Sequence, residues 1–156
     1  TAFVFQDVFL LEATLLENIR MGTDATEEQV RQAAQAAQID DFIMGLPKGY
    51  QTRIGDEGVK LSGGQQQRTS IGRAIIKNPS ILLCDEPTGA LDSNTSRDIL
   101  ILLEEINAKY GTTMLIVTHN NSIKNMVHKV LLMKDGLIHK SYENEVRVPA
   151  RELEDL

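Results

Sequence analysis

The sequence predicts an α/β fold with a parallel-sheet core and an inserted α-helical subdomain. Two observations predict it. Up to Asn78 the chain reads as helices joined by loops, whereas from Ile81 onward it alternates strand, helix and strand. This alternation is typical of parallel strands joined by crossover helices. We expect four segments: residues 1–12 as a connector leaving a first strand, 13–78 as the helical subdomain, 79–142 as the α/β core, and 143–156 as a charged, peripheral tail.

Composition limits the possible functions. At 156 residues the chain can form one compact domain, and its 42% hydrophobic and 24% charged residues are those of an ordinary globular protein. A net charge of -6, without a cluster of Lys and Arg, argues against a nucleic-acid surface. The longest apolar runs, residues 99–103 and 114–117, are far shorter than the ~20 residues that span a bilayer. A membrane role would therefore require a partner.

The single cysteine, Cys84, limits the redox chemistry of the chain. One cysteine excludes an internal disulfide framework and any CxxC metal pair, which suits a reducing cytoplasm. The N-terminus shows no secretory signal. We expect Cys84 to be a small core residue without a catalytic role.

Two helices are expected in the first part of the chain. Thr26 and Gln29 form a capping box, in which each side chain satisfies a backbone N–H at the helix start. Asp40 or Asp41 can cap a second, short helix, which stops before Pro47 because the residue preceding proline disfavours the helical conformation. The expected buried side of the first helix consists of Val30, Ala33, Ala34 and Ala37.

A loop-rich stretch then leads to a second capping box. Ser62 and Gln65 have the Ser-x-x-Gln spacing, so we expect a helix from there to about Asn78. The glycines that indicate the preceding loop are Gly45, Gly49, Gly55 and Gly58.

The core segment follows. Residues 81–84 are apolar throughout, as expected of a strand covered on both faces, and residues 112–117 form the next buried strand. Between them Asp92 or Ser93 can cap a helix that Gly111 closes. The apolar positions of that helix are Ile99, Leu102, Leu103 and Ile106.

A β-hairpin is the last predicted element. Asp135 and Gly136 separate the apolar runs 130–133 and 137–138. An Asp-Gly pair supplies the positive φ angles of a type I′ turn, the turn that fits the twist of two antiparallel strands.

The strand at residues 81–84 leads into two adjacent acids, Asp85 and Glu86. The carboxyl ends of parallel strands lie at the edge where open α/β sheets bind ligands. Adjacent side chains point in different directions, so one acid can hold Mg²⁺ through water while the other polarises an attacking water. Taken alone, the pair fits a solvated acidic turn better.

Residues 61–65, Leu-Ser-Gly-Gly-Gln, change that interpretation. Two glycines behind a serine N-cap let a phosphate approach the backbone, and the helix N-terminus adds the positive end of its dipole. An isolated Ser-Gly-Gly would only cap a helix. Here Gln66, Gln67 and Arg68 follow, and then the acidic strand, and that order is highly specific.

With these motifs the chain resembles the ATP-binding cassette (ABC) ATPases. Residues 61–65 look like their signature motif and residues 81–86 like their Walker B strand. Residues 90–92 resemble the D-loop, His119 the switch histidine and Gln6 the Q-loop glutamine. The motifs follow the family's order over nearly the whole chain, so the resemblance implies a partial P-loop NTPase fold of the ABC type.

The resemblance implies a role for each of these positions. Asp85 and Gln6 would hold Mg²⁺, and Glu86 would act as the general base for the water that attacks the γ-phosphate of ATP. His119 would contact that phosphate and position the water, in a reaction that depends mainly on positioning and charge stabilisation. The residues implied to bind nucleotide are Gln6, Ser62, Gly63, Gly64, Gln65 and Asp92, the last of which would otherwise only cap its helix.

The resemblance also implies partners. Ser62 and Gly64 would face the ATP held by a second cassette, so that two cassettes enclose two nucleotides head to tail. The Q-loop would pass movement to transmembrane domains, which would place the chain at the cytoplasmic face of a membrane. The remaining histidines, His128 and His139, are expected to be surface or packing residues.

One part of the family pattern does not occur in residues 1–156. No segment fits G-x-x-x-x-G-K-[ST], the phosphate loop whose backbone N–H groups and lysine hold ATP. We therefore expect this chain alone to bind ATP poorly and to show negligible hydrolysis. We also expect an apolar edge of the sheet to be exposed, which favours association.

Three functions stay open at this stage. The leading one is the nucleotide-binding part of an exporter; residues 46–58 look like exporter-type cassettes, whereas 88–92 and 133–136 look more like lipoprotein-release or macrolide-export cassettes, so the cargo is open. The second is a truncated, catalytically silent interaction fragment. The third, a soluble ABC-type ATPase of DNA repair, is disfavoured by the acidic charge and by the lack of a long coiled-coil insertion.

Overall fold

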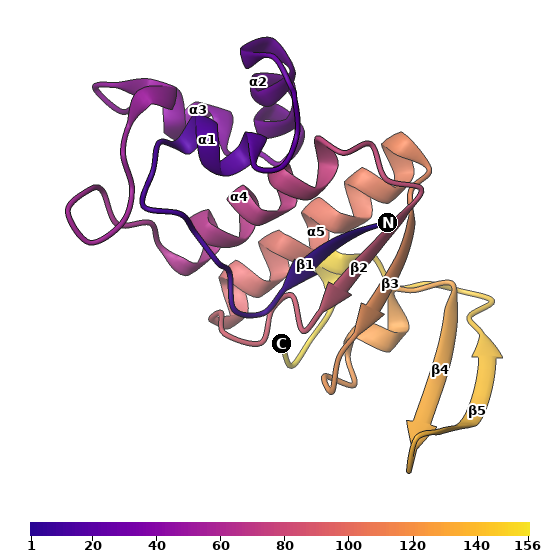
Figure 1. Ribbon diagram of the computed structural model, residues 1–156. Coiled ribbons are helices and arrows are strands. Elements are labelled where there is room, and N and C mark those ends of the chain that lie inside the picture. The colour runs from indigo at the N-terminus through magenta and orange to yellow at the C-terminus, as the bar shows by residue number, and fades with distance from the viewer.

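The computed structural model describes all 156 residues and contains the predicted parallel sheet (Figure 1). Its strands are β1 (Ala2–Phe5), β2 (Ile81–Asp85) and β3 (Thr113–Val117), in the order β1-β2-β3. Phe5 pairs with Asp85, and Asp85 pairs with Val117. The carboxyl ends of all three strands therefore meet at one edge of the sheet.

Three helices follow β1: α1 (Leu15–Arg20), α2 (Glu27–Ala36) and α3 (Asp40–Met44). Thr14 and Thr26 begin α1 and α2 with complete capping boxes, and the second of these confirms the prediction. The predicted cap of α3 is wrong, because its N-cap is Ile39 and no side chain caps it. Asp40 instead lies in the first turn, where its carboxylate accepts a hydrogen bond from Tyr50.

Two longer helices complete the body: α4 (Gly63–Ile75) and α5 (Ser93–Tyr110). The predicted caps are confirmed, with Ser62 at α4 and Asp92 at α5, and Gly111 closes α5 in the left-handed conformation at φ 63°. Helix α4 ends before the predicted Asn78, whose own backbone is left-handed at φ 47°. A left-handed residue cannot continue a right-handed helix, so the chain turns there into β2.

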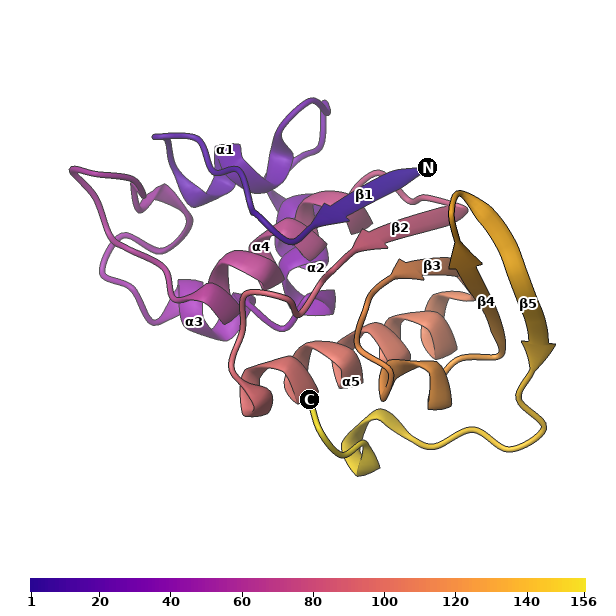
Figure 2. The ribbon, with the colours of Figure 1, turned by 90° about the horizontal axis from the view of Figure 1, so that it is seen from below.

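One face of the sheet packs on α4 and α5, and the opposite face carries no helix (Figure 2). The alternating side chains of β2 show this asymmetry, because Leu82 and Cys84 are buried whereas Ile81 is 43% exposed. The expectation of strands buried on both faces is therefore wrong. The other large exposed side chains of this face are Phe3, Phe5, Leu115 and Val117, and the rings of Phe3 and Phe5 stack at 5.8 Å between centroids.

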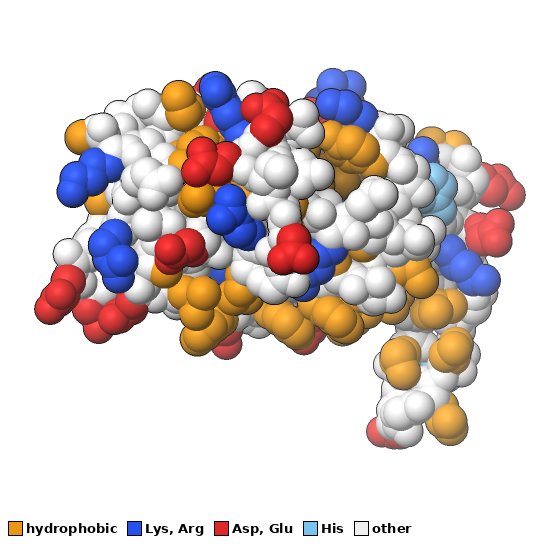
Figure 3. All heavy atoms as spheres, turned by 45° about the horizontal axis from the view of Figure 1, so that its top comes forward, with side chains coloured by type: hydrophobic (Ala, Val, Ile, Leu, Met, Phe, Trp, Pro, Cys, Tyr) orange, Lys and Arg blue, Asp and Glu red, His pale blue; other side chains and the backbone are white.

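The predicted hairpin is confirmed as β4 (Lys129–Lys134) and β5 (Leu137–Glu143). Asp135 at φ 51° and Gly136 at φ 77° make the tight turn. The hairpin pairs only with itself and projects from the body, with hydrophobic side chains on its surface (Figures 1 and 3). Exposed apolar residues of the hairpin are Leu131, Leu132, Met133, Leu137 and Ile138.

Three short 3-10 helices, η1 (Gly49–Gln51), η2 (Ile123–Asn125) and η3 (Ala150–Glu152), lie in the connections. The last of them corrects the expectation of a peripheral tail. Ala150 and Leu153 are buried against α5, and Arg97 of α5 donates a hydrogen bond to the Leu153 carbonyl at 2.9 Å. The tail is charged along its exposed side only. None of the helices is both long and apolar enough to cross a membrane.

Candidate functional site

The acidic pair lies at the carboxyl edge of the sheet, where β2 ends. Asp85 is the last residue of the strand and is exposed, and Glu86 follows with a left-handed backbone at φ 45°. Such a conformation costs about 1–3 kcal/mol for a residue other than glycine and persists only where neighbouring contacts enforce it. Here the Glu86 N–H donates to the Val117 carbonyl at 2.8 Å, and the Glu86 carbonyl accepts from the Gly89 N–H at 3.0 Å.

Glu86 and His119 form the closest polar pair of this edge. The Glu86 Oε1 atom lies 2.6 Å from His119 Nδ1 and accepts the His119 backbone N–H at 2.9 Å. The second carboxylate oxygen, Oε2, accepts the Thr118 hydroxyl at 3.1 Å. Burial by itself would raise the pKa of Glu86, but the hydrogen bonds from His119 and Thr118 outweigh it and lower the pKa from its ordinary value.

This geometry determines which ring nitrogen of His119 is available. An ionised carboxylate only accepts hydrogen bonds, so His119 Nδ1 carries the proton that it shares with Glu86. The other nitrogen, Nε2, then has no partner within the chain. The His119 side chain is 86% exposed, whereas that of Glu86 is 19% exposed. The pair thus presents a sheltered carboxylate and an open imidazole nitrogen to solvent.

Gln6 leaves β1 at the same edge of the sheet and lies against Gly89. A Cβ atom added at Gly89 would come within 2.8 Å of Gln6 Cδ, so only glycine allows this approach without moving the glutamine. Phe5, the last residue of β1, is paired with Asp85, the last residue of β2, so Gln6 and Glu86 follow the two strands from neighbouring positions. The exposed Gln6 amide is held near the turn that follows the acidic pair.

Residues 61–65, which we call the signature segment, lead into α4 and pack against the start of α5 and the residue before its cap. Ser62 Oγ accepts the Gln65 N–H at 3.3 Å, and Gln65 Oε1 accepts the Ser62 N–H at 2.9 Å. A Cβ atom at Gly63 would lie 2.9 Å from Leu91 Cδ2, and one at Gly64 would lie 2.7 Å from Thr95 Cγ2. Gly64 is buried by this packing, whereas Ser62 and Gly63 are exposed.

Asp92 caps α5 through several hydrogen bonds. Its carboxylate accepts the N–H groups of Asn94 and Thr95 at 3.1 and 3.0 Å, and the Thr95 hydroxyl at 2.6 Å. These bonds, the Thr95 side chain first, lower the pKa of Asp92. The same threonine whose methyl group packs on Gly64 therefore also bonds Asp92.

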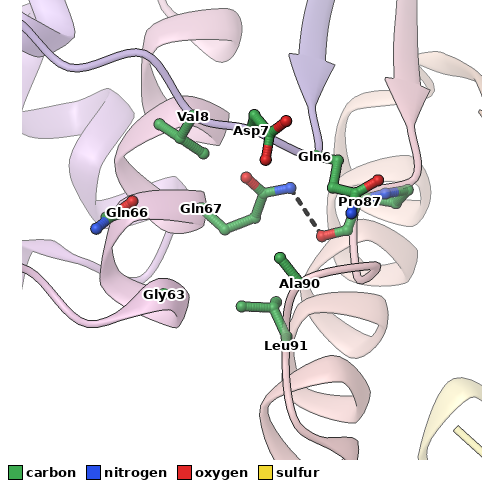
Figure 4. Close-up of a pocket in the computed structure, with 9 residues that line it drawn as sticks. All are labelled: Gln6, Asp7, Val8, Gly63, Gln66, Gln67, Pro87, Ala90 and Leu91. Carbon is green, nitrogen blue, oxygen red and sulfur yellow. Dashed lines mark hydrogen bonds between the residues drawn. The ribbon is translucent and has the colours of Figure 1, made fainter.

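A hollow lies between residues 6–8, which we call the Q-loop, the start of α4 and the turn after β2, and Figure 4 shows the residues that line it. The volume of this hollow is about 190 Å³. It brings Gln6 and Gly63 to one cavity, while Glu86 and His119 lie outside it as a separate pair. The carboxylate of Asp85 makes no hydrogen bond within the chain. The residues that line the hollow are Gln6, Asp7, Val8, Gly63, Gln66, Gln67, Pro87, Ala90 and Leu91.

Sequence reasoning missed three side chains that organise this region: Thr118, Gln67 and Arg73. Thr118 holds Glu86, and its position directly before His119 is a signal that could have suggested it. Gln67 and Arg73 lie in α4 and bond backbone carbonyls far away in sequence. Burial raises the pKa of the Cys84 thiol to about 12, in agreement with an unreactive core position.

The oxygen atoms of Asp85 and Gln6 at this edge of the sheet are of the kind that Mg²⁺ binds. Asp85 and Gln6 supply hard oxygen atoms, which Mg²⁺ prefers, and both side chains are exposed. No group of three or more His, Cys, Asp or Glu side chains forms a metal site of its own. Mg²⁺ commonly uses one or two protein oxygens and takes its other ligands from water and phosphates, so this sparse set is compatible with it.

The parallel sheet, the acidic pair at its carboxyl edge and the capped glycine helix together define a partial nucleoside-triphosphatase fold of the ABC type. Comparison with known families agrees with this class. The family described as ABC transporter matches residues 1–89, and the chain belongs to this family. Its members are ATPases, whose domains bind ATP.

Individual relatives match almost the whole chain. The ATP-dependent lipid A-core flippase of Legionella pneumophila (strain Lens) is 46% identical over 138 residues, which are 88% of this chain and 23% of the flippase. The mitochondrial potassium channel ATP-binding subunit of Pongo abelii is 39% identical over 144 residues, 92% of this chain and 20% of that protein. The chain thus spans between a fifth and a quarter of the length of these relatives.

A solved structure has a similar fold over most of this chain. A bacterial Atm1-family ABC exporter with ATP bound has a TM-score of 0.78 and 39% sequence identity, covering 91% of this chain and 25% of the exporter chain. The prediction of a partial ABC-type fold is confirmed.

Proposed function

We propose that residues 1–156 are part of the nucleotide-binding domain of an ABC exporter, which couples ATP binding and hydrolysis to transport across a membrane. The observation that carries this proposal is the Glu86–His119 pair at the carboxyl edge of the sheet, with Oε1 2.6 Å from Nδ1. A carboxylate beside an imidazole with a free nitrogen is suited to moving a proton from water next to a phosphate. The relatives with flippase and exporter names support the transport part of the proposal.

Each side chain would have a defined task in hydrolysis. Glu86 is ionised at neutral pH, because its pKa is lowered, and it would accept the proton of the attacking water once it separates from Nδ1. His119 would donate a hydrogen bond from the exposed Nε2 to the γ-phosphate in the doubly protonated form of the ring, because phosphate oxygens only accept and Nδ1 already shares its proton with Glu86. Gln6 would contact the same water or the phosphate from its position directly after β1. Phosphoryl transfer depends mainly on positioning and charge stabilisation, which is the kind of contribution that these polar groups would make.

Asp85 and Gln6 would hold Mg²⁺. When bound, the ion neutralises charge on the phosphate oxygens. The contribution of the chain is to present the two oxygen donors at the strand ends, where β1 and β2 are paired.

A second cassette would complete the site. The Ser62 oxygen accepts from Gln65, which leaves the Ser62 hydroxyl hydrogen free to donate to a phosphate. The first N–H groups of α4, at Gly63 and Gly64, have no partner within the helix and lie at its positive end. We infer that Ser62, Gly63, Gly64 and Gln65 meet the nucleotide of the other cassette, with Asp92 in the adjoining D-loop. The transmembrane domains would be the further partner, at the cytoplasmic face.

The test compares two polypeptides: residues 1–156, and the same residues preceded by a segment that contains a phosphate loop. We expect ATP hydrolysis with Mg²⁺ only from the longer one, because the shorter one lacks the phosphate cradle. Glu86→Gln in the longer polypeptide should reduce the rate by at least about a hundredfold, since general-base catalysis contributes at this scale. Glu145→Gln, at an exposed tail position, is the matched control and should leave the rate unchanged.

Robust hydrolysis by residues 1–156 alone would contradict the proposed need for the cradle. An extended polypeptide that never hydrolyses ATP would instead support the alternative of a silent interaction fragment. Binding to DNA, without association with a membrane protein, would favour a soluble ATPase of DNA repair.

A further inference from the structure

Gln67 of α4 is a buried polar residue that the catalytic roles above do not use. It is 2% exposed, and its Nε2 donates to the Pro87 carbonyl at 2.7 Å and to the Phe5 carbonyl at 3.3 Å. Figure 4 shows the amide between the start of the Q-loop and the turn after β2. One side chain therefore connects three segments that lie far apart in the sequence.

The two carbonyls that Gln67 binds belong to residues directly beside Gln6 and Glu86 in the sequence. Phe5 directly precedes Gln6, and Pro87 directly follows Glu86. Pro87 directly follows Glu86, whose left-handed backbone is strained for a residue other than glycine. The hydrogen bond from Gln67 to the Pro87 carbonyl therefore helps to hold this strained backbone in place. A displacement of Gln67 would therefore move the backbone beside both proposed site residues.

Stability alone does not account for an amide at this position. Because both neighbours are acceptors, the NH₂ group must face them, and Gln67 Oε1 then lies buried without a hydrogen-bond partner. An unpaired buried oxygen destabilises a fold, whereas an apolar side chain of similar size would avoid it. The donor bonds of the amide are the feature that an apolar residue cannot supply.

Arg73 supports the same arrangement from the next turns of α4. Its Nη1 donates to the Phe9 carbonyl at 2.7 Å and its Nε to the Asn18 carbonyl at 2.8 Å. Side chains of α4 thus bind the carbonyls of Phe5 and Phe9, the residues on either side of the loop of Gln6, Asp7 and Val8. That helix begins at the signature segment.

We propose that Gln67 is a positioning residue, which transmits the position of the signature segment at the start of α4 to Gln6 and Glu86. A ligand that moves the N-terminus of α4 would shift Gln67 and, through its two hydrogen bonds, the backbone at Phe5 and Pro87. This inference rests on the proposed function, since Gln6 and Glu86 have their roles from it.

The first test uses residues 1–156 and backbone hydrogen exchange. The Gly89 N–H bonds the Glu86 carbonyl and reports the turn, while the Ile99 N–H in α5 reports global stability. We expect Gln67→Leu to raise the Gly89 exchange rate about tenfold relative to Ile99, since local opening is measured separately from global unfolding. Gln35→Leu, at an exposed position of α2, is the control and should change neither rate. A Gln67→Leu variant in which both rates rise equally would overturn the proposal.

A second variant tests the donor bonds themselves. In Gln67→Glu the ionised carboxylate cannot donate to either carbonyl, but the protonated acid can donate one hydrogen bond. The excess exchange at Gly89 should therefore fall as the pH is lowered, when each rate is divided by that of the native chain at the same pH. Excess exchange that does not depend on pH would contradict a role for the donated bonds.

The third measurement is made in the extended polypeptide that contains a phosphate loop. Gln67→Leu should lower kcat about tenfold and change the KM for ATP by less than about twofold, because misplaced groups affect the reaction more than binding. If Gln67→Leu lowers kcat/KM only by raising KM and leaves kcat unchanged, the proposal is overturned. If the native extended polypeptide does not hydrolyse ATP, the proposed function fails, and the two exchange tests still decide whether Gln67 positions the turn.

Discussion

His119 contacts a single oxygen of Glu86 in two ways, through its backbone N–H at 2.9 Å and through its ring Nδ1 at 2.6 Å. The two residues lie 33 positions apart and follow the neighbouring strands β2 and β3. The backbone hydrogen bond fixes the position of the His119 main chain, and the contact with Nδ1 fixes the orientation of its ring. The carboxylate therefore orients the imidazole whose other nitrogen is free.

The lowered pKa of Glu86 predicts a specific dependence of stability on pH. Because the folded-state pKa lies below the unfolded value of about 4.3, the bonds to Glu86 stabilise the fold above that pH. This stabilisation is lost as the pH falls through the lower folded-state pKa. Glu86→Gln should be less stable than the native chain by roughly 1 kcal/mol at neutral pH, and the difference should shrink as the pH falls below the unfolded value of about 4.3. Urea unfolding followed by circular dichroism measures both values.

Glu145→Gln is the control for that experiment, since Glu145 is exposed and makes no hydrogen bond. A gap between the native chain and Glu86→Gln that stays constant on acidification would show that the carboxylate is not stabilised as described.

The packing of α4 on α5 predicts a sharp difference between two glycines. Gly64→Ala should cost about 1–3 kcal/mol, because its Cβ would meet the Thr95 methyl group at 2.7 Å. Thr95→Ser keeps the hydroxyl that bonds Asp92 and removes that methyl group, so the double variant should recover most of the loss. Gly72→Ala in the same helix has no atom closer than 3.6 Å and should be neutral or stabilising by up to about 1 kcal/mol. A double-mutant cycle with chemical unfolding checks this coupling, and strict additivity would refute it.

Tyr50 predicts a second effect on stability. Its hydroxyl donates to Asp40 Oδ1 at 2.5 Å, and Arg31 Nε lies 3.4 Å from the same oxygen. Tyr50→Phe should lower the free energy of unfolding by about 1.5–3 kcal/mol, the usual contribution of a hydrogen bond to a charged group. Tyr110→Phe, with a half-exposed ring and no hydrogen bond from its hydroxyl, should cost close to nothing.

Burial, and then the bond to Asp40, raise the pKa of Tyr50 above its ordinary value. The contribution of this hydroxyl is therefore complete below the unfolded pKa of about 10 and is lost as the pH rises toward the folded-state value. Spectroscopic titration at alkaline pH should show one tyrosine that ionises only together with unfolding. Three tyrosines that titrate alike would contradict this assignment.

The tail predicts a clear contrast between two leucines. Leu153 is 3% exposed against α5, whereas Leu137 in the hairpin is 72% exposed. Leu153→Ala should cost about 2–4 kcal/mol, and Leu137→Ala less than about 0.5 kcal/mol. Thermal unfolding of the two variants beside the native chain measures the difference, and equal losses would show that the tail is not part of the core.

Local signals in the sequence predicted the local structure well. The capping boxes at Thr26 and Ser62, the Asp92 cap, the Gly111 closure and the Asp135 turn all occur as expected. Each of them depends on hydrogen bonds or φ angles within a few residues, so the sequence contains the whole cause. The order of motifs was likewise sufficient to identify the ABC-type fold.

Features that depend on distant residues could not be predicted in the same way. An apolar run such as residues 81–84 does not reveal whether one or both faces of its strand are covered. Asp40 was expected to cap a helix, but Tyr50 is in reach only after the chain has folded. Gln67 and Arg73 likewise act on carbonyls supplied by β1 and by the segments after it and after β2.

The open face of the sheet has a practical consequence for the laboratory. Fluorescent dyes such as ANS are used to detect loosely packed states, because they bind exposed apolar surface. Here the stacked rings of Phe3 and Phe5, with Leu115 and Val117 beside them, offer such a surface in the fully ordered chain. The folded protein should therefore already be fluorescent with the dye, and a dye-based melting curve would start from a high signal. Its unfolding is better followed by circular dichroism.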